Sequence, residues 1–408
     1  MKLTDEEQAI LLGEGGRGAQ KAMEILVALG KIYRAFDMVP VQSAQIAGVS
    51  YRNIGDPGVE FLADWVQLGA KVAIPAFMNP AGIDRKLWKQ MGVDAPFAKK
   101  QMKIISHLEK MNIEPTLTCT PYHIGHVPQF GEHIAWSESS AVSFANSVLG
   151  ARTNREGGPS ALAAAIVGRT PRFGLHLDEN RLASHHITVK TRLSSPADYG
   201  ALGYWIGKQV GGGIPYIEGL AEMNGSLEVT EYLKALGAAM AASGAVALYH
   251  IQDVTPEAVN SGHQLLKKDH IKIRVEQLND AYQELKKSGD KLDLVALGCP
   301  HHSLEEIRAV AQTVAGRKFK VEFWITTSYQ IRQSAAAEGW VQLIESAGGK
   351  VISDTCMVVA PLKEAGFNHI AVNSAKAACY LPSHQGAVTY WGTTEQCIQA
   401  AIEGKWKF

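Results

Sequence analysis

Short apolar runs alternate with helical segments through the last third of the chain, and this alternation constrains the fold more than any other feature. The runs cover about 293–297, 320–325, 350–353 and 370–372, and a polar turn follows each of them. Short β-type runs that are joined by helices through short connections are typical of β-α-β units. The pattern predicts a parallel sheet with helices on its faces, and therefore an α/β fold.

The chain has 408 residues, which is enough for two or three domains with sizeable cores. We place a boundary near residue 240, where the regular alternation begins, and expect an N-terminal α/β region (1–240) and a C-terminal α/β region (241–408). Lys+Arg and Asp+Glu both number 40, so no overall charge directs the chain to nucleic acid or a membrane surface. The start MKLTDEEQ has no apolar signal core, and no apolar run reaches about 18 residues. We expect a cytoplasmic protein.

The first half is harder to divide into elements. Thr4 and Glu7 form a capping box, which predicts a helix to about Leu12. Residues 13–18 match G-x-G-x-x-G, but that fingerprint must follow a strand, so we interpret them as a helix cap and turn. Strands are expected at about 39–41, 71–76, 116–119 and 245–250, and a helix from about residue 137.

Cys119, Cys299 and Cys356 share one context, since each follows an apolar β-type run and lies in a turn. Ligands of open α/β sheets bind at the carboxyl ends of strands. Three thiolates arriving there could hold three irons of an iron–sulfur cluster and leave one iron open as a Lewis acid. A free buried cysteine is also a common small core residue, and the spacing alone does not decide between the two. Cys379 and Cys397 lie in apolar helical contexts and are interpreted as structural.

Other candidate binding residues also lie in turns, after expected strands or at the starts of expected helices. The small residues Gly48–Ser50 would let backbone N–H groups approach an anion, although an ordinary turn explains them as well. Asn79 follows an expected strand. Glu138 and Lys376 lie at the starts of expected helices. Glu138 could simply be a carboxylate that the helix dipole favours, and Lys376 a lysine whose stem lies along the protein surface. The neighbouring residues His185 and His186 should point to opposite faces of a strand and cannot share a metal, so we interpret them as surface or satisfied core histidines.

Several motifs taken together resemble the aconitase X family. They are AGVSY, FMNP, TLTC, AWSESSAVSFANSVLGARTNREGGP, ALGCPH, SDTCMVV and VNSAKAA, and they are distributed along essentially the whole chain. The resemblance implies an aconitase-like fold in which several α/β/α units with parallel sheets surround a central iron–sulfur cluster. It also implies a smaller swivelling domain that closes over the cluster.

The resemblance implies roles for individual residues. Cys119, Cys299 and Cys356 match the ligands of a [4Fe-4S] cluster, which an aerobic preparation could hold as [3Fe-4S] or lose. Glu138 and Lys376 match catalytic positions. The positions that match substrate contacts are Gly48, Val49, Ser50, Asn79, Pro80, Glu138, Ser139 and Lys376. The roles of His123, His126, His301 and His302 stay open.

The nearest branch of the family dehydrates (R)-5-phosphomevalonate to trans-anhydromevalonate 5-phosphate in the archaeal modified mevalonate pathway of isoprenoid synthesis. In that branch the swivelling domain is a separate small subunit, and we expect the catalytic base, a serine, to lie on it. An alternative within the family is dehydration of cis-3-hydroxyproline. An alternative from another class is a non-catalytic protein that binds a phosphorylated or carboxylate ligand and only buries its cysteines.

Overall fold

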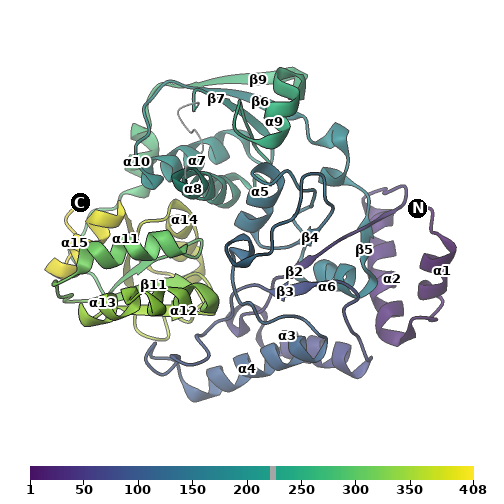
Figure 1. Ribbon diagram of the computed structural model, residues 1–408, viewed down its shortest axis with the longest axis horizontal. Helices are drawn as coiled ribbons and strands as arrows, with labels where there is room; N and C mark the ends of the chain where they lie inside the picture. The colour runs from purple at the N-terminus through teal and green to yellow at the C-terminus, as the bar shows by residue number, and fades with distance from the viewer. Residues whose placement is uncertain (221–226) are drawn as a thin grey trace.

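The C-terminal segment folds as a five-stranded parallel sheet with helices on both faces (Figure 1). The computed structural model describes residues 1–220 and 227–408. The strands are β10 (Leu294–Leu297), β11 (Glu322–Thr327), β12 (Lys350–Ser353), β13 (His369–Val372) and β14 (Val388–Trp391), in the order β12-β11-β10-β13-β14. The helices are α11 (Leu304–Val314), α12 (Tyr329–Ala337), α13 (Trp340–Ser346), α14 (Ala375–Gln385) and α15 (Thr394–Glu403).

The strand order reverses between β10 and β13, because the chain leaves β10 toward β11 and β12 and later returns to the other side with β13 and β14. Such a switch point opens a crevice at the carboxyl ends of the two strands, where open α/β sheets bind ligands. Cys299 follows β10, and Ser374 and Lys376 follow β13. The sequence-based prediction of a parallel sheet in this part of the chain is confirmed.

The middle unit is a second parallel sheet, in the order β8-β7-β6-β9. Its strands are β6 (Ala183–Val189), β7 (Pro215–Glu218), β8 (His250–Ile251) and β9 (Leu266–Val275). Its helices are α7 (Pro196–Val210), α8 (Leu227–Gly244), α9 (Pro256–Ser261), the 3-10 turn η4 (Gly262–Leu265) and α10 (Asn279–Leu285).

The first unit holds only short strands. Three of them, β2 (Ala44–Ile46), β3 (Ala76–Met78) and β4 (Ala135–Trp136), form a parallel sheet, and β1 (Met38–Pro40) pairs antiparallel with β5 (Arg169–Pro171). The helices are α1 (Asp5–Leu11), α2 (Gly16–Ile32), α3 (Tyr51–Gln67), α4 (Ala95–Lys110), α5 (Ser139–Ser147) and α6 (Gly158–Val167), with the 3-10 turns η1 (Pro121–Ile124), η2 (Gly174–His176) and η3 (Asp178–Asn180).

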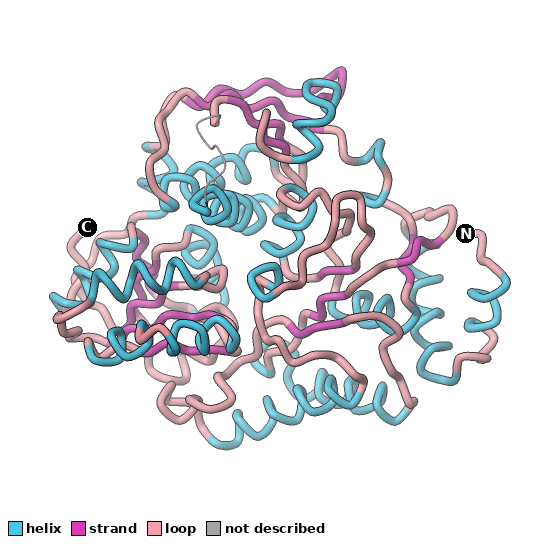
Figure 2. The backbone as a smooth tube through the Cα atoms, in the orientation of Figure 1, coloured by secondary structure: helices cyan, strands magenta, loops and turns pink. Residues whose placement is uncertain are grey.

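The three units meet around α8. Figure 2 shows their strands as separate groups, and α8 packs against α7 of its own unit, α5 of the first unit and α14 of the last. One apolar core runs from the middle sheet into the C-terminal unit and includes Cys299 and Cys356. The interior between the units therefore brings α5 of the first unit and α14 of the last unit against α8. The division at residue 240 stays a prediction.

Several sequence-based elements of the first half were wrong. No strand covers 71–76, because Val72 and Ala73 donate to the separate carbonyls of Met111 and Ala165, and the strand is Ala76–Met78. No strand covers 116–119 either, since Leu117 has a φ of 50° and interrupts the extended backbone. The strand expected at 245–250 is reduced to His250–Ile251, because Ala245 also has a positive φ.

Other predictions for the first half were correct. The capping box of Thr4 and Glu7 is present, and residues 12–15 form a turn between two helices. The cap and turn expected over 13–18 is shorter than predicted, because α2 begins at Gly16. No helix among the described residues is both long and apolar enough to cross a membrane.

Candidate active site

The three cysteines arrive from three separate loops and are all buried. Cys119 lies between α4 and η1, Cys299 directly after β10 and Cys356 shortly after β12. Gly298, which precedes Cys299, has a φ of 96°, and a Cβ there would lie 2.2 Å from the carbonyl oxygen of Thr326. Only glycine fits that turn without displacing the backbone.

The cysteines are electrostatic neighbours. Burial raises the pKa of Cys119, and the negative charges of Glu138 and Cys356 add to the effect, while the charge of Lys376 opposes it. Burial also raises the pKa of Cys299 to about 12, again against the charge of Lys376. A bound metal cation reverses this situation, because it deprotonates a coordinating thiol.

The cysteine sulfurs are spaced too widely to share one ion. Within the described residues, the three do not form a group whose ligand atoms all lie within 4.8 Å of one another. Metal–sulfur bonds of about 2.3 Å require closer sulfurs around a single zinc ion. A cluster in which each thiolate holds a different iron suits the wider spacing.

His301 connects the cysteine loops. Its backbone N–H donates to Cys119 Sγ at 3.3 Å, and its ring lies between Thr118, at 2.9 Å from Nδ1, and the Thr355 carbonyl oxygen, at 2.9 Å from Nε2. A carbonyl only accepts, so Nε2 carries the proton and Nδ1 accepts from the Thr118 hydroxyl. Burial lowers the pKa of His301 to about 4, which keeps this neutral tautomer at pH 7.

Glu138 and Lys376 form a buried ion pair across the units. Glu138 caps α5 and accepts from the Ala141 N–H at 2.7 Å and the Ser140 hydroxyl at 2.6 Å, and the Lys376 ammonium donates to the same carboxylate and to Ser140 at 3.0 Å. Ser139 lies 3.3 Å from that carboxylate. Burial alone would raise the pKa of Glu138, but the charge and hydrogen bond of Lys376 outweigh it and lower the pKa.

The predicted substrate loops lie against the Cys356 loop. Ser50 donates to the Val359 carbonyl at 2.8 Å, and the backbone N–H of Ala81, directly after Asn79 and Pro80, donates to the Asp354 carbonyl at 2.8 Å. The side-chain oxygen of Asn79 is buried and has no hydrogen-bond partner. An unpaired buried acceptor of this kind is costly, and a ligand with a donor would satisfy it.

Gln101 of α4 fixes the first loop, and sequence reasoning missed it. Its side-chain oxygen accepts from the backbone N–H groups of Tyr51 and Gly82, at 2.8 and 2.9 Å, and its amide donates to the Val49 carbonyl at 2.8 Å. The side chain is fully buried. A polar residue on the apolar face of α4 was the available signal in the sequence.

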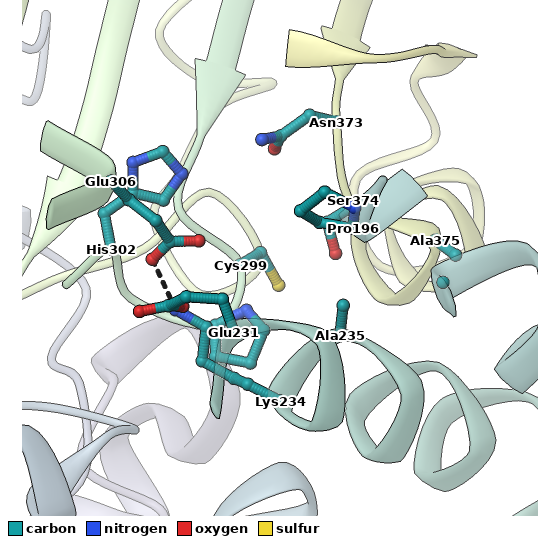
Figure 3. Close-up of a pocket in the computed structure, with 12 residues that line it drawn as sticks. Pro196, Glu231, Lys234, Ala235, Cys299, His302, Glu306, Asn373, Ser374 and Ala375 are labelled. Carbon is teal, nitrogen blue, oxygen red and sulfur yellow. Dashed lines mark hydrogen bonds and ion pairs between the residues drawn. The ribbon is translucent and has the colours of Figure 1, made fainter. Parts of the chain in front are cut away.

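A small pocket opens beside Cys299. Figure 3 shows the Cys299 sulfur between a charged group on one side and Asn373 and Ser374 on the other. The charged group is Lys234 of α8, which is paired with Glu231 and Glu306. Sequence reasoning missed Lys234 and Glu231, although a lysine and a glutamate three positions apart in an otherwise apolar helix indicate a buried pair.

The other histidines differ from His301. Burial lowers the pKa of His123 and of His302 to about 3, and each has one buried ring nitrogen without a hydrogen-bond partner. His302 also lines the pocket beside Cys299. His126 stacks on Phe77 and lies 3.6 Å from the exposed carboxylate of Glu114, and it does not line the pocket beside Cys299.

Most of the chain matches models of one protein family. Residues 1–179 match the aconitase X first domain, residues 183–283 the second domain and residues 292–403 the third domain. The chain belongs to the aconitase X family. A solved structure, described as the holo-form of Thermococcus kodakaraensis aconitase X, superposes with a TM-score of 0.88 at 46% identity, covering 98% of this chain and 100% of that chain. The predicted family and the aconitase-like α/β fold are confirmed.

Curated relatives of this aconitase X chain carry two names. The phosphomevalonate dehydratase large subunit of Methanocaldococcus jannaschii is 48% identical over 98% of this chain and 100% of that protein. The protein of the same name from Thermococcus kodakarensis is 49% identical over 94% of this chain and 95% of that protein. The cis-3-hydroxy-L-proline dehydratase of Pseudomonas aeruginosa is 35% identical over 98% of this chain and 70% of that protein. All three are dehydratases by name.

Proposed function

We propose that this chain is the large subunit of a hydro-lyase that removes water from (R)-5-phosphomevalonate to give trans-anhydromevalonate 5-phosphate, in the archaeal modified mevalonate pathway. The observation that carries the proposal is the identity of 45–50% to four curated large subunits of phosphomevalonate dehydratase, against 35% to the bacterial cis-3-hydroxyproline enzyme. The buried site between the three units supports it.

The three cysteines would hold a [4Fe-4S] cluster through three of its irons. Their burial, their separate loops and a spacing wider than one ion allows all fit such a group. When bound, the cluster supplies an open iron position that acts as a Lewis acid toward a hydroxyl and a carboxylate. In a non-catalytic binding protein, the three cysteines would not need the charged groups of Glu138 and Lys376 beside them.

Lys376 and Glu138 would act on the substrate at the edge of that group. The Lys376 ammonium is near Cys119 and Cys299 as well as Glu138, so it can bind an anionic oxygen of the substrate as a point charge. Glu138, which the ion pair with Lys376 keeps ionised, would hold the departing hydroxyl by accepting a hydrogen bond from it. Ser139 lies on the first turn of α5, where its hydroxyl can contact the substrate.

The loop at Gly48–Ser50 would bind an anionic end of the substrate, and the loop at Asn79–Pro80 would accept a hydrogen bond from a substrate hydroxyl. The backbone at Gly48 has a φ of 77°, and successive N–H groups in such a turn attract anions. Asn79 offers the unpartnered side-chain oxygen described above. Gln101 would keep the first loop in position while the substrate enters.

Dehydration also needs a base, and we place it on a small partner subunit. The proton leaves the carbon between the carboxylate and the hydroxyl-bearing carbon, a C=C bond forms, and the departing hydroxide and the proton become water. The Glu138 oxygens already accept from Lys376, Ser139, Ser140 and the Ala141 N–H, so this carboxylate is not free to take that proton. A serine on the swivelling domain of the small subunit would do so.

The test is a substrate screen on anaerobically prepared protein, with and without the small subunit. The two-subunit enzyme should consume (R)-5-phosphomevalonate and leave cis-3-hydroxyproline unchanged, and the large subunit alone should be inactive. Turnover of cis-3-hydroxyproline would favour the second candidate. Turnover by the large subunit alone at the full rate would overturn the assignment of the base.

A further inference from the structure

A group of histidines and a glutamate lies on the middle sheet, apart from the site described above. His186 is on β6, Glu218 ends β7 and His263 is in η4. In the part of the chain that the structure describes, this is the one group of three whose metal-ligand atoms all lie within 4.8 Å of one another. The sheet lies at the top of Figure 1, above α7 and α8.

The sheet register explains why the side chains meet. His186 pairs with Tyr216 and Thr188 with Glu218 in the parallel ladder of β6 and β7. Because alternate residues of a strand share a face, His186, Tyr216 and Glu218 lie on one face of the sheet. His185 points to the other face, as the sequence predicted, and its ring contacts the Ser184 hydroxyl at 2.9 Å.

The contacts within the group suit a cation better than a complete hydrogen-bond network. His263 Nε2 is hydrogen-bonded to one oxygen of Glu218 at 2.5 Å, and His186 Nε2 lies 3.0 Å from the other. The His186 contact does not have hydrogen-bond geometry, so this buried nitrogen is left without a partner. Two imidazoles that converge on both oxygens of one carboxylate are a typical donor set for zinc.

A third histidine adds an independent observation. The rings of His186 and His270 have centroids 5.8 Å apart. His270 Nδ1 donates to the Lys267 carbonyl at 2.6 Å, so Nε2 of the neutral ring carries no proton. This nitrogen is buried and has no hydrogen-bond partner. Metal-bound histidines usually donate their other ring N–H to a carbonyl or carboxylate in this way. His270 is therefore the nearest candidate for a fourth ligand.

We propose that His186, Glu218 and His263 form a Zn²⁺ site that fastens the turn η4 to the inner strands β6 and β7. The role is structural, because the ligands come from three segments of the middle unit and the group is not part of the cysteine site. The site is reachable from solvent, since the His263 side chain is 62% exposed. Occupancy would join the turn before β9 to the sheet, and would leave the dehydration chemistry unchanged.

The test is zinc binding by the full chain after its cluster has been reconstituted anaerobically, so that the cysteines are occupied. Equilibrium dialysis against micromolar Zn²⁺ should give one zinc per chain in the wild type and in the matched control His185→Gln. Glu218→Gln and His263→Ala should each weaken binding at least about tenfold. His263 is exposed, so its replacement leaves the fold intact even if Glu218→Gln does not.

Two results would overturn the proposal. One is unchanged zinc binding in His263→Ala and Glu218→Gln, and the other is no zinc bound by the wild type at micromolar concentration. Substitution with Co²⁺ gives a further readout, because a histidine and carboxylate site lacks the thiolate charge-transfer band that a cysteine site shows. A thiolate band that His263→Ala leaves unchanged would assign the metal to cysteine and contradict the site.

Discussion

The backbone N–H of His301 donates to the sulfur of Cys119 across 3.3 Å, although 182 residues separate them along the chain. The ring of the same histidine contacts Thr118 and Thr355, the residues that directly precede Cys119 and Cys356. His301 therefore links the loop after β10 to the loops of Cys119 and Cys356. A residue with this position determines how far apart the three thiols lie.

Replacement of His301 by Ala should destabilise the protein and weaken retention of iron. The change leaves the Thr118 hydroxyl and the Thr355 carbonyl buried with a partner missing, and each such group costs about 1–3 kcal/mol. Urea unfolding and iron analysis of anaerobic protein measure the two effects. The exposed His384→Ala is the control, and a stability of His301→Ala equal to that of the control would refute the linking role.

Lys376→Gln should cost about 3–5 kcal/mol of unfolding free energy, because it leaves the Glu138 carboxylate buried without its counter-ion. The double variant Glu138→Gln, Lys376→Met removes both charges and should recover most of that stability. It should still lose at least about 100-fold in dehydration rate if these groups act on the substrate. Urea unfolding measures the contribution of the pair to stability, and the rate with (R)-5-phosphomevalonate measures its contribution to the reaction. A double variant as active as the wild type would contradict the proposed role of Glu138 and Lys376 in the reaction.

Gln101→Ala should raise the KM for substrate, because the loop at 48–51 loses its two hydrogen bonds to this side chain and Gly82, which lies shortly after Pro80, loses a third. Gln101→Glu keeps the acceptor for Tyr51 and Gly82 but loses the donor to Val49 and buries a charge, so it should also raise the KM. Gln399→Ala is the matched control, because the partly exposed Gln399 of α15 hydrogen-bonds within its own helix, to Glu403. Steady-state kinetics measure the change in KM. An unaltered KM in Gln101→Ala would show that Gln101 does not contribute to substrate binding.

Stability should fall as the pH drops from about 6.5 toward 4. Burial lowers the pKa of His123, His176 and His302 to about 3, and that of His301 to about 4, from 6.5. The unfolded chain therefore binds more protons than the folded chain in this window, so acid favours unfolding. One such histidine is worth about 2 kcal/mol between pH 7 and pH 5. Urea unfolding at both pH values tests this, and equal stabilities would contradict it.

The C-terminal unit could be predicted from sequence because its signals are local. Strand, polar turn and capped helix follow one another within a few residues, as at β10, Gly298 and the box of Ser303 and Glu306. Cys299 and Cys356 could therefore be placed at strand ends. Strand β14 was missed, although Gly386 ends α14 in the left-handed conformation and marks the turn before it.

The first unit could not be predicted in the same way. Its strands have only two or three residues, which is too short for any periodicity, and their partners lie far apart along the chain. Cys119 follows an irregular segment that is held by long-range bonds to the Met78 carbonyl. The pairing of Lys234 with Glu306 and the clamp of Gln101 also depend on tertiary contacts that no local pattern reports.

We expect Cys119, Cys299 and Cys356 to hold an iron–sulfur cluster in this chain. Iron and acid-labile sulfide content, measured after anaerobic reconstitution together with the small subunit, tests this. The wild type should contain about four iron and four sulfide per chain, which should be lost in Cys299→Ser and kept in Cys397→Ser, because Cys397 is buried in the core of the C-terminal unit. A wild type without iron, or a Cys299→Ser variant with full iron and sulfide, would contradict it.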